Sequence, residues 1–202
     1  MELKTTLLLA VLVVLAFLAA CSTQTVQNST SDAVSLDDLP ERVGGGGDHR
    51  EIIPPSSGNE VGVVAPDFTA TTTEGEEFTL SSFKGEKPVM VYFMATWCPF
   101  CRQDFKTLGS LYGNYEDSIE MITMSLDLSE SANTLSNYKT QFSGIDAVQF
   151  TTGQSSVLQA YSVSHTTTKY AIAKDGTILY KGSGAFSAEQ WDVLLQELVE
   201  TI

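Results

Sequence analysis

Two cysteines, Cys98 and Cys101, stand two residues apart in the pentapeptide Trp97-Cys98-Pro99-Phe100-Cys101. Such a pair can close a reversible disulfide, and a thiol at the start of a helix is favoured as the thiolate by the helix dipole. The thiolate is the nucleophile of disulfide exchange. The spacing therefore predicts redox chemistry. We expect Cys98 to be the exposed attacking thiol, and Cys101, one helical turn further on, to be the more buried resolving thiol.

The segments around the cysteines have the patterns that this chemistry needs. Residues 88–95 are almost all apolar and indicate a buried strand that ends just before the motif. After the motif, apolar residues at 105, 108, 111, 112 and 115 recur with a helical period. Pro99 suits a first helical turn, because its missing N–H would have no partner there. The cysteine pair is thus predicted to lie where a strand gives way to a helix.

The rest of the chain reads as alternating strands and helices. Strands are predicted at 67–72, 77–80, 89–95, 120–127, 147–151, 169–173 and 177–181, and helices after Cys98, from 128 to about 142, at 156–161 and from Ser187 onward. Gly75 and Gly176 follow acidic residues at two hairpin turns, and Ser187 with Gln190 forms a capping box. This order predicts an α/β fold in which helices cover both faces of a mixed sheet, with a β-hairpin before it.

The first 21 residues have the composition of an export signal. The apolar run from Leu7 to Ala20 has 14 residues, fewer than the ~20 of a membrane span, and fits the core of a secretory signal peptide at 1–20. The sequence Leu18-Ala19-Ala20-Cys21 resembles the lipobox of bacterial lipoproteins. That resemblance implies lipid on Cys21 and a place in the cell envelope, outside the cytoplasm. An uncleaved anchor, or an ordinary signal with an incidental cysteine, are the alternatives.

Residues 21–60 are predicted to be a flexible tether between this anchor and a single domain at 61–202. They are rich in small polar residues, contain four consecutive glycines at 44–47, and show little apolar periodicity. Such a composition cannot bury enough apolar surface to offset chain entropy. The domain carries 17 acidic and 8 basic residues, a net charge of −9. That charge argues against nucleic acid or an anionic membrane surface as a direct ligand.

Several segments of the domain together resemble a known family. They are Ala65-Pro66-Asp67-Phe68, residues 80–85, the block 93–101, Tyr161-Ser162-Val163 and Lys174-Asp175-Gly176. With the order of elements, they resemble the thioredoxin fold and, more narrowly, the exported TlpA/ResA-like thiol-disulfide oxidoreductases of the redoxin (AhpC-TSA) superfamily. The resemblance implies a reductase of protein disulfides such as those of apocytochrome c. It also implies a membrane thiol electron donor of the DsbD/CcdA type, and no cofactor besides the Cys98–Cys101 disulfide.

Two positions depart from the family pattern. Thr167 stands where the family has a cis-proline, so the Thr166–Thr167 bond is expected to be either a strained cis bond or a trans bond in a loop of different shape. By resemblance, the Thr166 backbone would pair with an extended substrate segment. Tyr92 stands where cytosolic thioredoxins have a buried acid, so the aid to proton transfer must come from elsewhere or from water. His165 could approach the cysteines, or could be an exposed loop residue.

The remaining residues of the motif are predicted to form the rim of the site. Trp97 and Pro99 would shape it, and Phe100 would offer an apolar contact; core packing is the alternative for Trp97. The Pro-Phe dipeptide between the cysteines carries no charge that separates a reductase from an oxidase. A peroxiredoxin and a copper chaperone of the SCO type are the rival functions. The first needs a different context around Thr96, and the second needs Cys-x-x-x-Cys, one residue longer than the spacing here. No metal site is expected, although the missing proline could admit a metal.

Overall fold

The computed structural model describes residues 58–201 of the chain. The predicted signal sequence, the predicted lipid-attachment residue Cys21 and nearly all of the predicted tether lie outside these residues. Within the described part, no helix is both long and apolar enough to cross a membrane.

A five-stranded mixed sheet forms the centre of the fold, in the order β5-β4-β3-β6-β7. The strands span Val89–Met94 (β3), Glu120–Ser125 (β4), Gln149–Thr151 (β5), Thr168–Ile172 (β6) and Ile178–Gly182 (β7). β3 lies in the middle, parallel to β4 and antiparallel to β6. Every residue of β3 is buried, as its continuous apolar run predicts for a strand covered on both faces.

A separate hairpin precedes the sheet. Its strands β1 (Thr69–Thr71) and β2 (Glu77–Thr79) pair antiparallel. Gly75 in the turn has a φ of 88°, which glycine adopts without the penalty of a Cβ atom. A bridge between Thr72 and Thr151 joins the hairpin to the edge strand β5. The predicted N-terminal hairpin is thus confirmed, with shorter strands than expected.

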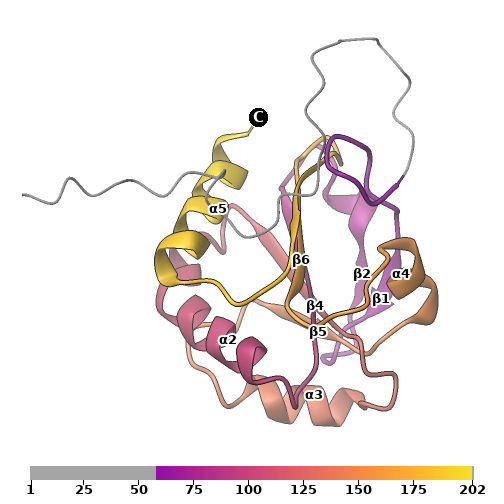
Figure 1. Ribbon diagram of the computed structural model, residues 1–202, viewed down its shortest axis with the longest axis vertical. Helices are drawn as coiled ribbons and strands as arrows, with labels where there is room; N and C mark the ends of the chain where they lie inside the picture. The colour runs from indigo at the N-terminus through magenta and orange to yellow at the C-terminus, as the bar shows by residue number, and fades with distance from the viewer. Residues whose placement is uncertain (1–57, 202) are drawn as a thin grey trace, which may run out of the picture. The chain divides into compact units, whose positions relative to one another are not determined.

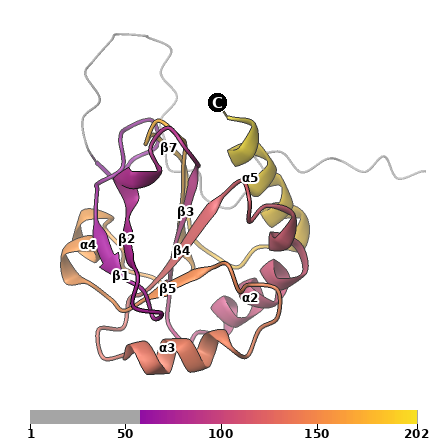
Figure 2. The ribbon, with the colours of Figure 1, turned by 180° about the vertical axis from the view of Figure 1, so that it is seen from behind.

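Helices cover both faces of the sheet. They are α2 (Pro99–Leu111), α3 (Ala132–Lys139), α4 (Ser155–Ala160) and α5 (Ala188–Glu200), with short 3₁₀ turns at Leu80–Phe83 and Tyr112–Asn114. α2 and α5 lie along one face, whereas α4 and the β1–β2 hairpin lie on the other (Figures 1 and 2). Tyr92 of β3 belongs to the buried cluster under α2 and α5, and its neighbour Phe93 belongs to the opposite cluster. This alternation is that of a strand between two layers, and it confirms the predicted α/β class.

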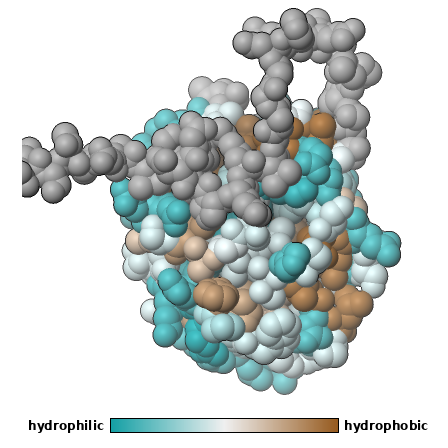
Figure 3. Space-filling view, in the orientation of Figure 1, coloured by the Kyte–Doolittle hydropathy of each residue, from teal (hydrophilic) through white to brown (hydrophobic). Residues whose placement is uncertain are grey.

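One face of the described domain is mostly polar. On this face, seen in Figure 3, hydrophilic residues and residues of intermediate hydropathy cover most of the described surface, and apolar residues gather in patches, the broadest of them on the right of the view. Most of the large apolar side chains are instead held in the two buried clusters. The predicted capping box of the last helix is present: Ser187 accepts the N–H of Gln190, whose side chain accepts the N–H of Ser187.

Candidate active site

Cys98 lies at the N-cap of α2, directly after the turn that leaves β3. Its backbone is extended, with φ −79° and ψ 118°, and Pro99 takes the first helical position. Its Sγ accepts a hydrogen bond from the N–H of Cys101 at 3.2 Å, as a serine hydroxyl does at an ordinary N-cap. An N–H of the first turn aimed at the sulfur favours its negatively charged form. The predicted junction of strand and helix is confirmed.

The expectation that Cys98 is exposed is wrong. Only 2% of its surface is accessible, against 0% for Cys101, and both residues are free thiols. The loop before β6 accounts for this burial, because the Thr166 Oγ1 atom lies 3.3 Å from the Cys98 Sγ. Sequence spacing places Cys98 at a helix start, but the residue that covers it is 68 positions away. Little of Cys98 is therefore exposed in this arrangement of the loop.

Thr167, at the position of the missing proline, follows a trans peptide bond. No cis bond occurs within residues 58–201, so the trans alternative holds. Thr167 has a φ of 60°, in the left-handed region, which costs a β-branched residue about 1–3 kcal/mol. Its Oγ1 accepts the N–H of Gly184 at 2.8 Å. A hydrogen bond to the loop between β7 and α5 thus holds this residue in an unusual conformation.

The thiol of Cys101 is strongly disposed to keep its proton. Burial, together with the hydrogen bond and the charge of Cys98, raises the pKa of Cys101 to about 12. Hydrogen bonds from the Ala95 backbone and the Tyr92 side chain act in the opposite direction. Cys101 must therefore lose a proton before or while it acts as a nucleophile.

This raised pKa predicts a loss of stability at alkaline pH. Its folded-state pKa is about 12 against an ordinary value of 9.0, so between these values only the unfolded chain releases the Cys101 proton. We expect the difference in unfolding free energy between reduced wild type and Cys101→Ala to fall as the pH rises from about 8 to about 10.5. Urea unfolding with excess reductant at both pH values measures it, and a difference independent of pH would contradict the burial argument.

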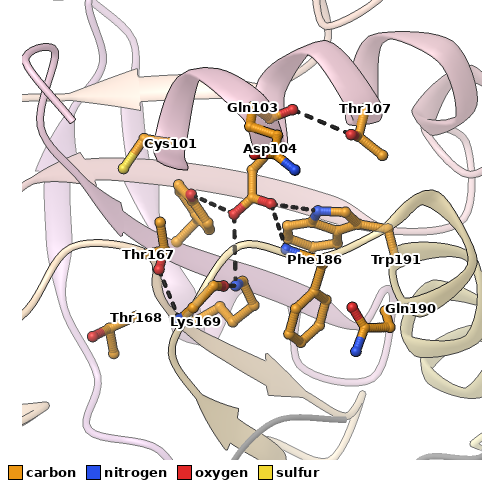
Figure 4. A network of polar contacts seen from close by, with 12 residues as sticks. Cys101, Gln103, Asp104, Thr107, Thr167, Thr168, Lys169, Phe186, Gln190 and Trp191 are labelled. Atoms are coloured by element: carbon orange, nitrogen blue, oxygen red, sulfur yellow. Dashed lines mark hydrogen bonds and ion pairs between the residues drawn. The ribbon is translucent and has the colours of Figure 1, made fainter. Parts of the chain in front are cut away.

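Asp104, one turn after Cys101, lies fully buried on the inner side of α2. Its Oδ2 accepts the hydroxyl of Tyr92 at 2.8 Å. Its Oδ1 accepts the backbone N–H of Phe186 at 2.8 Å and the indole N–H of Trp191 at 3.1 Å. Figure 4 shows this carboxylate in the middle of a polar network formed by α2, the sheet and α5, with Cys101 beside it. Three donors thus compensate for the loss of water around it.

Lys169 of β6 completes the network as a fully buried cation. Its Nζ lies 3.7 Å from the Asp104 Oδ2, donates to the Gly184 carbonyl at 2.5 Å and sits 4.0 Å from the centroid of the Phe186 ring. Burial lowers the pKa of Lys169 to about 8, while the negative charges of Asp104 and Cys101 oppose this lowering. Buried charges are tolerated when paired, so Asp104 and Lys169 depend on each other.

Tyr92 connects this ion pair to the resolving cysteine. Its hydroxyl donates to Asp104, and its side chain also hydrogen-bonds Cys101. Burial, and then the charges of Asp104 and Cys101, raise the pKa of Tyr92 well above its ordinary value. The phenol therefore remains neutral. A proton from Cys101 can pass to the phenol oxygen while the phenol proton moves to Asp104. The chain thus has a buried acid near its cysteines. That acid is Asp104, and the Tyr92 side chain links it to Cys101.

The turn before Cys98 is held by a second buried carboxylate. Glu130, after β4, accepts the Thr96 N–H at 2.8 Å and the Thr96 hydroxyl at 2.5 Å through Oε1. Its Oε2 accepts the Ser125 hydroxyl at 2.6 Å. Thr96 precedes Trp97 and Cys98, so Glu130 fixes the backbone from which the attacking thiol projects.

The rim of the site carries large exposed apolar side chains. Trp97 is 63% exposed and Phe100 is 59% exposed, so core packing is wrong as the role of Trp97. Leu128, from the loop after β4, is 58% exposed. The same loop orients the indole, because Trp97 Nε1 donates to Asp127 Oδ2 at 3.0 Å. Pro99 and Phe100 open α2, which places the predicted rim residues next to the cysteines.

His165 is an exposed loop residue. Its Nδ1 lies 2.8 Å from the Ser164 hydroxyl. It directly precedes Thr166, the residue whose hydroxyl contacts Cys98. Within residues 58–201, no three or more His, Cys, Asp or Glu side chains gather in a group that could hold a metal ion.

Sequence reasoning missed Asp104, Lys169 and Glu130, although two of them had a signal. Asp104 falls on the apolar helical face formed by positions 101, 105 and 108, where a charged residue needs a buried partner. Lys169 is the second residue of β6 and is followed by three buried residues of that strand. Glu130 gives no such signal, because it lies in an irregular loop among polar neighbours.

The fold and the cysteine pair define a thioredoxin-like thiol-disulfide oxidoreductase, and comparisons agree. A family model described as the AhpC/TSA family matches residues 61–181, and the chain belongs to this family. It is 31% identical over 140 residues to thiol-disulfide oxidoreductase ResA of Bacillus thuringiensis subsp. konkukian. The aligned region covers 69% of this chain and 79% of that protein.

Solved structures confirm the fold. One is a thiol:disulfide interchange protein of the thioredoxin family from Chlorobium tepidum, with a TM-score of 0.58 and 24% identity over 68% of this chain and 97% of that one. Another is the thioredoxin domain of a thiol-disulfide oxidoreductase from Bacteroides vulgatus, with a TM-score of 0.56 and 22% identity over 69% of this chain and 98% of that one. The predicted thioredoxin-like architecture is therefore confirmed.

Proposed function

We propose that this oxidoreductase is a reductase of protein disulfides in the cell envelope, tethered to the membrane by lipid on Cys21. The observation that carries the chemistry is the pair of free thiols at the start of α2, with the Cys98 Sγ accepting the Cys101 N–H at 3.2 Å. The similarity to ResA supports the direction. The signal-like residues 1–20 and the lipobox-like sequence before Cys21 support the location.

The reaction has two exchange steps. The Cys98 thiolate attacks one sulfur of a partner disulfide; a Cys98–partner disulfide forms, the partner's S–S bond breaks, and the released partner sulfur takes up a proton. Cys101 then gives up its proton and attacks the Cys98 sulfur. The Cys98–Cys101 disulfide forms, and the second partner sulfur leaves and is protonated. The partner gains two electrons and two protons; the cysteine pair loses two electrons, the proton of Cys101, and the proton that Cys98 released to solvent when its thiolate formed.

Each turnover therefore leaves the cysteine pair oxidised. A dithiol donor must reduce it again, and we assign this role to a membrane thiol carrier of the DsbD/CcdA type. The partner disulfides are those of extended or unfolded polypeptides, such as apocytochrome c. The exposed Trp97 and Phe100 would contact apolar side chains of such a segment, and the Thr166 backbone would pair with its main chain.

The reduction potential of the Cys98–Cys101 pair tests this direction. We expect a value well below that of glutathione, together with catalysed reduction of insulin disulfides by the purified full-length protein. Equilibration with glutathione redox buffers, followed by alkylation and mass measurement, gives the potential. A potential well above that of glutathione would indicate an oxidase instead. Peroxide consumption with a thiol donor, or tight copper binding by the reduced protein, would favour the peroxidase or the copper chaperone.

A further inference from the structure

We propose that Thr166 is a catalytic residue of this site, whose hydroxyl donates a hydrogen bond to the Cys98 thiolate, and that Thr167 is the positioning residue that holds it there. The proposal rests on the attack by Cys98 proposed above. It also gives the departure from the family's proline a function, because Thr167 provides a hydroxyl that anchors the loop and a proline at this position could not.

The contact to the nucleophile is direct. The Cys98 Sγ and the Thr166 Oγ1 lie 3.3 Å apart, with the thiol donating to the hydroxyl. Once Cys98 loses its proton, its sulfur can only accept, and the Thr166 hydroxyl is then the group that can donate along the same line. The Cys101 N–H already points at this sulfur from 3.2 Å. The thiolate thus receives two hydrogen bonds, and bonds to a charged acceptor are the stronger kind.

Thr167 anchors the loop from the other side. It is 2% exposed, and its Oγ1 accepts the Gly184 N–H at 2.8 Å. The Gly184 carbonyl in turn accepts the Nζ of the buried Lys169 at 2.5 Å. Figure 4 shows the Thr167 side chain beside the Lys169 network. The loop is also closed across its short span, because the Thr168 hydroxyl donates to the His165 carbonyl at 2.8 Å.

The conformation of Thr167 excludes the residue that the family uses. Its φ of 60° is out of reach for proline, whose ring fixes φ near −65°. Glycine would adopt this φ freely, yet it would lose the hydroxyl that bonds Gly184. A β-branched residue persists in the left-handed region only where its surroundings hold it. The hydroxyl of Thr167 is therefore the feature that keeps the neighbouring Thr166 hydroxyl over the sulfur.

The first test removes the donor while keeping the shape. In Thr166→Val we expect the thiolate fraction of Cys98 at a fixed pH below its titration midpoint to fall about tenfold, the size of one charge-assisted hydrogen bond. Ultraviolet thiolate absorbance of the reduced protein measures it, with Cys98→Ser as the blank. Cys101 does not contribute near neutral pH, since burial raises its pKa to about 12. Thr166→Ser should restore most of the fraction.

The potential gives an independent readout. Loss of thiolate stabilisation disfavours the reduced pair, so the potential of Thr166→Val, measured where wild-type Cys98 is fully ionised, should become more negative by about 30 mV for a tenfold change. Thr107→Val on α2 is the matched control, because within residues 58–201 its hydroxyl bonds only the Gln103 carbonyl of the same helix. It should leave both quantities unchanged. A thiolate fraction within twofold of wild type in Thr166→Val would overturn the proposal.

A double-mutant cycle tests whether Thr167 acts through Thr166. Thr167→Val should lower the thiolate fraction in the same direction, and Thr167→Ser should restore it. The double variant should be no worse than Thr166→Val alone, because the second change removes a contact that is already lost. Additive losses would overturn the positioning role. The thiolate fraction and the reduction potential are measured without a partner protein. If the wild-type protein did not reduce insulin, the proposed reductase function would be refuted, and the role of Thr166 would still be decided by these two measurements.

Discussion

Replacing Asp104 by alanine should lower the free energy of unfolding by about 3–5 kcal/mol, the cost of breaking a buried ion pair from one side. The change removes the acceptor of the Tyr92 hydroxyl and of the Trp191 indole N–H. It also leaves Lys169 fully buried without its nearest negative charge, 3.7 Å away. For a domain of this size the melting temperature should fall by roughly 10–20 °C. Urea unfolding of the reduced protein measures the loss.

Two further variants separate the charge from the hydrogen bonds. Asp104→Asn keeps the volume and one oxygen acceptor, so we expect a smaller loss than with alanine. Adding Lys169→Met to Asp104→Asn removes the unpaired cation and should recover part of that loss, which appears as a favourable coupling energy. If the free energy of unfolding of Asp104→Ala lies within about 1 kcal/mol of the wild-type value, the carboxylate does not hold this network together.

The sequence predicts the parts of the molecule that depend on local pattern. Three local patterns predicted their elements correctly: the apolar run at 89–95, the helical period after Cys98 and the Ser187–Gln190 capping box. Periodicity and capping involve residues that are close in the sequence, so they can be recognised from the sequence alone. The Cys98–Cys101 spacing belongs to this class, because Cys98 is the N-cap of α2 and Cys101 lies in its first turn.

The parts that escaped prediction depend on distant residues. Asp104 and Lys169 are far apart in the chain and meet only because β6 lies beside β3 under α2. The burial of Cys98 has the same origin, since Thr166 reaches it from the loop before β6. The left-handed backbone conformation of Thr167 is one that threonine disfavours, and the hydrogen bond from the Gly184 N–H to its side chain holds it there. Each of these features is tertiary, and each lies at the active site.

Loss of either cysteine should stop turnover, but the two variants should differ in whether a partner becomes trapped as a mixed disulfide. In Cys98→Ser we expect disulfide reduction to fall to the uncatalysed rate, with no partner attached, because the nucleophile of the first step is gone. In Cys101→Ser turnover should also stop, but Cys98 still attacks, and the mixed disulfide with the partner accumulates. Non-reducing electrophoresis and mass measurement of the quenched reaction distinguish the two. Near-wild-type turnover in Cys98→Ser would refute its role.

The resolving step should depend on Tyr92, because it is the group that links the Cys101 thiol to Asp104. Burial raises the pKa of Cys101 to about 12, so resolution at neutral pH needs a path for its proton. In Tyr92→Phe we expect the first step to keep its rate and the mixed disulfide to persist about 10²–10⁴-fold longer, as when a general base is lost. Tyr112→Phe is the matched control, since it removes a buried hydroxyl whose only hydrogen-bond partner in the described part of the chain is the Ile119 carbonyl. Equal lifetimes of the mixed disulfide in both variants would mean that water, and not the phenol, takes the Cys101 proton.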